Sequence, residues 1–145
     1  MRPRSIVLFE QLFLASLVVS LIGLALGFNA VASQWSSDAN VRAIGLGGGF
    51  LLATAAVSYL IYLLLWFLIA RRGSNVAKWF LIAFVAIGVV STFATLAANS
   101  HYVLTLVNAL GLVCYALEVA SLVFLFKPDA NAWLKGERAD PAAFE

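Results

Sequence analysis

Apolar residues fall into four long blocks along the chain, separated by short polar segments. The blocks cover residues 5–28, 45–70, 77–98 and 102–126. Each has roughly the 20 residues that a helix needs to cross the hydrocarbon core of a bilayer. Backbone groups in lipid must be hydrogen-bonded within their own segment, and the period-two alternation of barrel strands is absent. The pattern therefore predicts an all-α protein, an antiparallel bundle of four transmembrane helices.

The polar segments between the blocks predict the connections. Residues 71–75 form a tight turn in which Gly73 ends one helix and Ser74 or Asn75 caps the next. Short turns of this kind make sequential helices antiparallel neighbours. The first connection, residues 29–41, is longer and polar, and we expect it to lie outside the membrane.

Composition changes sharply after Pro128. Residues 1–128 are expected to be a single transmembrane domain, and residues 129–145 a cytoplasmic tail. Within the tail, residues 129–136 could form a short interfacial helix held by Trp133 and Leu134.

The composition supports a membrane location, because the chain is 63% hydrophobic and 11% charged. Soluble domains are about half apolar and a quarter charged. A net charge of +2 is too small to indicate nucleic acid as a partner. The single cysteine, Cys114, excludes an internal disulfide, and the single histidine, His101, excludes bis-histidine haem and His-rich metal sites. We expect neither a metal nor a cofactor.

Basic residues predict the orientation by the positive-inside rule. Of the nine, only Arg42 falls on the side of the first connection, and the other eight are Arg2, Arg4, Arg71, Arg72, Lys78, Lys127, Lys135 and Arg138. Both ends are therefore expected in the cytoplasm, in a multi-pass protein of the inner (plasma) membrane. Trp79 and Trp133 on the inside and Trp35 on the outside are expected to be interface anchors.

One alternative for the first block is a secretory signal peptide. Two arginines, an apolar run and then residues 30–32 (AVA) resemble such a leader with its cleavage site. The run is longer than a typical leader core and contains Glu10, so we expect the first helix to be retained.

Motifs for enzymatic chemistry are not found in the sequence. The glycine-rich segment 45–50 lacks the lysine and hydroxyl residue of a phosphate loop, and Phe50 replaces the third glycine of a dinucleotide fingerprint. His101 and Asp38 offer no third group for a hydrolase triad. We therefore expect a protein that is not an enzyme.

Small residues recur at helical spacing and predict close contacts between helices. They are Ser16, Ser20, Gly23 and Gly27 in the first block, Gly49, Ala53 and Ala56 in the second, and Gly88, Ser91, Thr95 and Ala98 in the third.

Two acidic residues lie inside the predicted spans, where an ionisable group is costly and marks a functional hypothesis. At 1.5 Å per residue, Glu10 is about 9 Å and Glu118 about 13 Å from the cytoplasmic edge. If the first and fourth helices are neighbours, the two carboxyls could meet and titrate as a pair. Glu10 could instead pair with Lys78 or reach the lipid headgroups.

Glu118 shares one helical face with Asn108, Gly111 and Tyr115. No basic residue lies at its depth, so we expect it to be protonated at neutral pH and buried against other helices. Three interpretations stay open. The acids could be packing contacts between helices, part of a proton or cation pathway, or contacts to a partner protein.

Short motifs resemble a group of small four-helix inner-membrane proteins of bacteria. They are residues 2–5 (RPRS), 9–14 (FEQLFL) and 77–79 (AKW), with Leu125-Phe126 and Trp133. This resemblance implies a bacterial inner membrane and no particular activity. Small multidrug exporters share the layout of four helices with a glutamate in the first, but this chain is longer and lacks their glycine-rich fourth helix.

These features together favour a small integral membrane protein that acts as an accessory, assembly or interaction subunit. Its partners would be the bilayer and either another membrane protein or a second copy of itself. The alternative is a proton-coupled small transporter or channel that uses Glu118 and Glu10.

Overall fold

The computed structural model describes residues 3–37, 41, 47–98 and 105–136. Within these ranges lie five helices and no strand: α1 (Arg4–Ser37), α3 (Gly48–Arg72), α4 (Asn75–Ala98), α5 (Leu106–Phe124) and α6 (Pro128–Lys135). All but α6 are long and apolar enough to cross a membrane. The predicted all-α bundle of four membrane-length helices is confirmed, and the chain is a multi-pass membrane protein.

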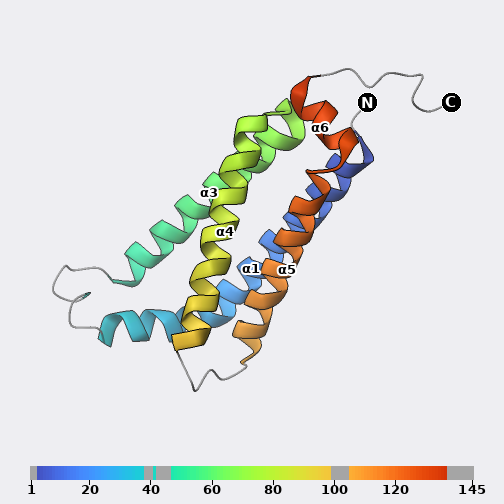
Figure 1. Cartoon of the computed structure of the whole chain (residues 1–145). Coiled ribbons are helices and arrows are strands. Elements are labelled where there is room, and N and C mark those ends of the chain that lie inside the picture. The colour runs from blue at the N-terminus through green and yellow to red at the C-terminus, as the bar shows by residue number, and fades with distance from the viewer. Residues whose placement is uncertain (1–2, 38–40, 42–46, 99–104, 137–145) are drawn as a thin grey trace.

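The four long helices run roughly side by side, and each reverses the direction of the one before it in the chain (Figure 1). The most extensive contact joins α1 to α5, the first and last of the four. α3 packs on α1 and α4, and α4 also contacts α5. α6 turns back over the end of the bundle, where it contacts α1.

α1 is longer than predicted, because it continues as a helix to Ser37 instead of ending at Phe28. Its 34 residues measure about 51 Å, against about 30 Å for the hydrocarbon core. The segment after Phe28 was expected to be a loop because it is polar. A polar segment can still be helical. Residues 29–37 contain neither glycine nor proline, so nothing in them ends the helix before Ser37.

The turn between α3 and α4 is the one predicted. Gly73 adopts the left-handed conformation with φ 63° and its N–H donates to the carbonyls at the end of α3. The Ser74 hydroxyl accepts a hydrogen bond from the Ala77 amide at 3.3 Å. α5 begins later than predicted, with Thr105 as the cap whose hydroxyl accepts from the Asn108 amide.

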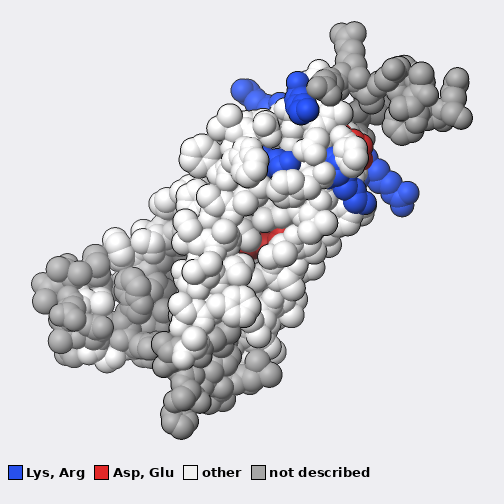
Figure 2. Space-filling view, in the orientation of Figure 1, with Lys and Arg blue, Asp and Glu red and all other residues white. Residues whose placement is uncertain are grey.

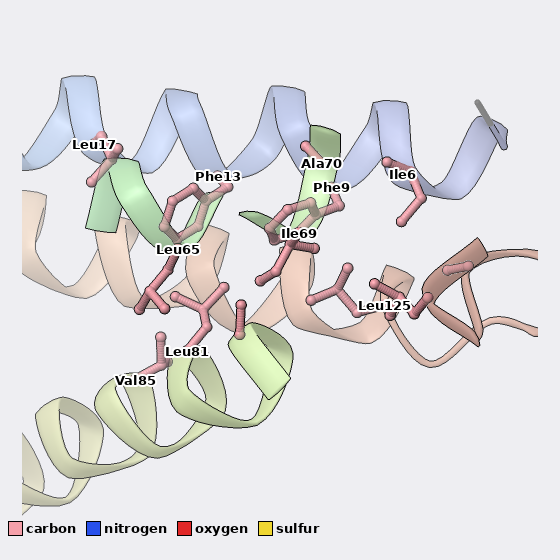
Figure 3. Close-up of a cluster of buried hydrophobic side chains, with 13 residues drawn as sticks. Ile6, Phe9, Phe13, Leu17, Leu65, Ile69, Ala70, Leu81, Val85 and Leu125 are labelled. Carbon is pink, nitrogen blue, oxygen red and sulfur yellow. The ribbon is translucent and has the colours of Figure 1, made fainter. Parts of the chain in front are cut away.

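The side chains that are wholly buried gather at one end of the bundle. α1 contributes Phe9 and Phe13, stacked with ring centroids 5.5 Å apart, and these face Ile69 of α3 and Leu81 of α4 (Figure 3). The complete buried cluster comprises Ile6, Phe9, Phe13, Leu17, Leu65, Ile69, Ala70, Ala77, Leu81, Val85, Leu125, Ala130 and Leu134. We call the half of the bundle that contains this cluster the packed half.

The opposite half consists of residues 18–37, 48–64, 86–98 and 106–117, and we call it the open half. Here most apolar side chains that the structure describes are exposed, including Leu60, Ile87 and Leu106 at 65–68%. α1 and α5 still approach each other closely in this half. The evidence is that a Cβ added at Gly27 would lie only 3.0 Å from the Val107 side chain. α3 and α4 leave most of their side chains in this half uncovered.

Charged side chains mark the packed end. Figure 2 shows the lysines and arginines of the described chain gathered around this end, with acidic atoms both there and at mid-height. They are Arg4, Arg71, Arg72, Lys78, Lys127 and Lys135. The fold therefore brings these six basic residues, which were predicted to lie together, to one end of the bundle. The remaining basic residues, Arg2, Arg42 and Arg138, lie outside the described residues.

Candidate functional site

Glu118 lies inside the bundle, at the boundary between the packed half and the open half. It is 5% exposed, and α5 packs on α1 and α4. The Ser121 hydroxyl donates to its backbone carbonyl at 2.7 Å, which is an ordinary contact within a helix. The prediction that Glu118 is buried against other helices is confirmed.

The carboxyl group of Glu118 is only partly satisfied. Its Oε1 accepts from the Cys114 thiol, with Sγ 3.7 Å away. The same thiol lies 3.4 Å from the Ser16 carbonyl of α1, so its single proton is divided between two acceptors. Glu118 Oε2 is buried and has no hydrogen-bond partner among the residues that the structure describes. Unpartnered buried polar atoms are rare, which makes this oxygen the main feature of the candidate site.

Hydroxyl groups and aromatic rings surround the carboxyl. Tyr62 of α3 interacts electrostatically with Glu118, and its ring packs 6.0 Å from that of Phe13. Ser20 of α1 and Tyr59 of α3, both in the open half, share a short hydrogen bond. The surroundings of Glu118 are therefore neutral but polar, and they come from α1, α3 and α5.

The polar face predicted around Glu118 is present on α5. Tyr115 is half-buried, and its ring lies against Gly88 of α4, where an added Cβ would come within 3.1 Å of the ring. At Gly111 an added Cβ would meet nothing within 4 Å, so open space adjoins this face. Asn108 is half-buried near the start of the helix. The Thr92 hydroxyl of α4 donates to the Gly88 carbonyl of its own helix at 2.9 Å.

Glu10 is at a different kind of place from Glu118. Its carboxylate forms an ion pair with Arg71 at the end of α3, with 3.5 Å between Oε1 and Nη2. Of the two alternatives for Glu10, Lys78 or the lipid headgroups, the pair with Lys78 is not the one formed, since Lys78 Nζ is bonded to the Leu125 carbonyl and to Asn131. α1 and α5 are neighbours as expected, but Glu10 points to the α3 terminus while Glu118 points into the bundle. The two acids therefore act separately, and only Glu118 belongs to an internal site.

The predicted tryptophan anchors behave differently from one another. Trp79 of α4 is 59% exposed, as expected for an anchor in the interface. Trp133 is instead half-buried, with its backbone and indole against Gly73 in the turn before α4. Leu134 is buried in the same cluster, so α6 uses these side chains to pack on the bundle. The side chain of Trp35 lies outside the described residues.

Lys78 is a buried residue whose role the sequence did not reveal. It is 3% exposed, and its Nζ donates to the Leu125 carbonyl at 2.8 Å and to Asn131 Oδ1 at 2.9 Å. The ammonium group also lies 4.1 Å from the centroid of the Phe126 ring. Lys78 thus fastens the start of α4 to the corner between α5 and α6.

Asp129 makes the second fastening at this end. Its carboxylate accepts from the hydroxyl of Ser5 at 2.8 Å and from the amide of Ser5 at 3.3 Å. Burial opposes ionisation of this carboxyl, but these bonds and those from the α6 backbone outweigh it, so the pKa of Asp129 lies below its ordinary value. The carboxylate lies at the first turns of both α1 and α6, whose dipoles favour a negative charge.

The described residues contain no group of three or more His, Cys, Asp or Glu side chains able to hold a metal ion. The internal site itself presents one carboxyl group in contact with one thiol, and a carboxyl group can exchange a proton or a hydrogen bond. No known protein family, curated protein or solved structure matches this chain.

Proposed function

We propose that this chain is a non-enzymatic subunit that associates, within the bilayer, with a helix of a second membrane protein. The observation that carries the proposal is the stripe Gly49, Ala53 and Ala56 of α3. All three residues are exposed, and by the 3.6-residue period they lie opposite Leu51 and Leu65, the residues that α3 buries.

Comparison with the other small residues supports this proposal. Gly27 of α1 is used inside the chain, against Val107, and Gly88 of α4 is used against Tyr115. At Gly49 an added Cβ would meet nothing within 4 Å. Small residues in membrane helices allow backbones to approach closely, which lipid tails do not require. The α3 stripe is thus a helix contact for which the described chain supplies no helix.

The test is enlargement of the stripe. Ala53→Leu with Ala56→Leu should remove a stoichiometric partner from the complex purified in a mild detergent, because the larger side chains keep the backbones apart. The control, Val57→Leu with Ile61→Phe, adds bulk to a neighbouring face of α3 and should leave the complex intact. Loss of the partner from both variants, or from neither, would reject the stripe as the contact.

A second copy of the chain is an alternative occupant. It is distinguished with a cysteine at Ala53 in a Cys114→Ser background. A disulfide between two copies in native membranes would show a homodimer and reject a different protein as the partner.

A second candidate function, proton-coupled transport, is supported by the unpartnered Oε2 atom of Glu118. Purified protein in proteoliposomes should then carry protons down an imposed gradient, and Glu118→Gln should abolish the flux while the protein still folds. Glu10→Gln serves as the control, because Glu10 pairs with Arg71 outside the internal site. Absence of flux from the wild-type protein under any proton or cation gradient would reject this function.

We further propose that the packed end faces the cytoplasm of a cell and that the membrane is a bacterial inner membrane. The support is the group of basic residues at that end, since the cytoplasmic side of membrane proteins is enriched in lysine and arginine. A cysteine at Ser74, in a Cys114→Ser chain, should be labelled by an impermeant thiol reagent only after the cells are opened. Labelling in intact cells would invert the orientation.

A further inference from the structure

Access to Glu118 from the packed end is closed. On α5, Ser121 and Leu125 lie one and two turns below Glu118 and are both 0% exposed. Val85 and Leu81 of α4 belong to the same buried cluster as Leu125, and they are 2% and 0% exposed. Beyond them Lys78 and α6 cover the end of the bundle. Water has no route to the carboxyl through these side chains.

The other direction is less tightly packed beyond the first turn. Cys114, one turn above Glu118, is still buried at 7% exposure, but Gly111, two turns above, adjoins open space and Asn108, one turn further, is half-buried. Ser20 and Tyr59 add hydroxyl groups on the facing helices. The route from the open half to Glu118 is thus lined by polar groups and small residues.

We propose that Glu118 is a proton-binding site that exchanges with only one side of the membrane, the side of the open half, along the Asn108–Gly111–Tyr115 face. The step is simple: the carboxyl proton passes to hydroxide or water from that side, which leaves a carboxylate, and it returns in the reverse step. The inference rests on the second proposed function for its biological meaning, because proton transport would also require a second conformation in which Glu118 exchanges with the packed end. The one-sided route is a property of the packing in this structure.

The groups that face Glu118 are consistent with a site that is neutral when loaded. From α3 comes Tyr62, from α1 the Ser16 carbonyl through Cys114, and from α5 itself Cys114. No lysine or arginine is among these contacts. A lone carboxylate here would lack a counter-ion, so a proton that arrives along the open route is held until it can leave by the same route.

The only cysteine in the sequence provides the reporter, because Cys114 touches Glu118 and thiols react as thiolates where water reaches them. The experiment measures the labelling rate of Cys114 in the full-length protein by a small impermeant methanethiosulfonate, applied to either side of oriented vesicles. We expect labelling at least tenfold faster from the side of the open half. Gly111→Leu should slow it by a similar factor, since leucine would occupy the open space.

Two variants in a Cys114→Ser background calibrate the depth. Asn108→Cys should be labelled faster than Cys114 from the same side, and Ser121→Cys should not be labelled from either side. The proposal is overturned if Cys114 is labelled equally from both sides or faster from the packed end. It is also overturned if Cys114 is unlabelled while Asn108→Cys reacts, or if Ser121→Cys reacts as fast as Cys114.

The outcome separates the route from the transport function. One-sided labelling without any proton flux would reject transport and keep the route. Flux that depends on Glu118 together with two-sided labelling would keep transport and reject the one-sided route. Gly111→Ala is the matched control, because its single methyl group fits the open space without filling it.

Discussion

The two halves of this bundle have similar hydrophobicity and very different packing. In the packed half, Phe9, Phe13 and Leu81 are removed from the surroundings completely, whereas Ile87 and Leu106 in the open half are 65% and 68% exposed. The four spans have similar mean hydropathy, 1.9–2.2, and each of them runs through both halves. The difference comes from the shapes of the side chains and from the polar contacts that close one end.

This comparison illustrates how membrane helices are held together. In lipid, an apolar side chain gains little from leaving the solvent, so packing and hydrogen bonds decide which surfaces meet. The packed half combines interlocking aromatic rings with the fastenings of Lys78 and Asp129. The open half has small residues and hydroxyl groups, which leave room for something else. Four predictions test this contrast, from the largest effect to the smallest.

The largest effect is expected from a cavity in the packed half. Phe13→Ala removes a ring that stacks on Phe9 and contacts Tyr62, and should lower the free energy of unfolding by about 3 kcal/mol. Phe93→Ala, at a position 64% exposed, should change it by less than about 0.5 kcal/mol. Reversible unfolding in mixed micelles measures both. Equal losses would mean that the two halves are packed alike.

Lys78→Met should cost about 2–3 kcal/mol, because it leaves the Leu125 carbonyl and the Asn131 side chain without their donor. The matched control is Lys127→Met, since Lys127 is exposed near the same corner. Thermal unfolding followed by circular dichroism measures the change. A stable Lys78→Met variant would show that the fastening contributes little.

Acid should release α6 before it affects the rest of the bundle. Because the folded pKa of Asp129 lies below its ordinary value of 3.8, its contribution to stability is complete above about pH 4 and is lost as the pH falls through the folded pKa. The expected loss is about 1 kcal/mol, the value of a helix cap. Hydrogen exchange of the α6 amides should report it, and Asp129→Asn should exchange faster already at neutral pH with a flatter dependence on acid.

The smallest effects distinguish two glycines. Gly111→Ala should be neutral or stabilising by up to about 1 kcal/mol, since alanine favours the helix and nothing lies within 4 Å of the new methyl group. Gly88→Ala should be destabilising by about 1 kcal/mol, because its methyl group would press on the Tyr115 ring at 3.1 Å. Unfolding curves of the two variants give the sign directly.

The sequence predicted the elements well where one physical rule dominates. The length of the apolar blocks gave four helices, and Gly73 with Ser74 gave the turn between α3 and α4. The polar face of α5 gave the burial of Glu118, because an acid in a span avoids lipid. The extension of α1 to Ser37 was missed, since a change to polar residues ends a membrane span without ending a helix.

Partners that are distant in the chain could not be predicted. Lys78 meets Leu125 across 47 positions, and Asp129 meets Ser5 across 124. Basic residues near a helix end are ordinarily placed at the headgroups, and nothing in the local sequence of Lys78 indicated that it is buried. Which base an acid meets also depends on the rotation of the helices, so the sequence offered Lys78 as one alternative for Glu10 and did not indicate Arg71.

The contact between Asp129 and Ser5 has a consequence for how the protein is made. Synthesis proceeds from the N-terminus, and the first turn of α1 exists long before the residue that caps it has been added. α1 therefore waits, with the Ser5 amide uncapped, until Asp129 has been added. A chain cut before Asp129 would contain all four membrane helices and still lack the contact that joins α1 to α6.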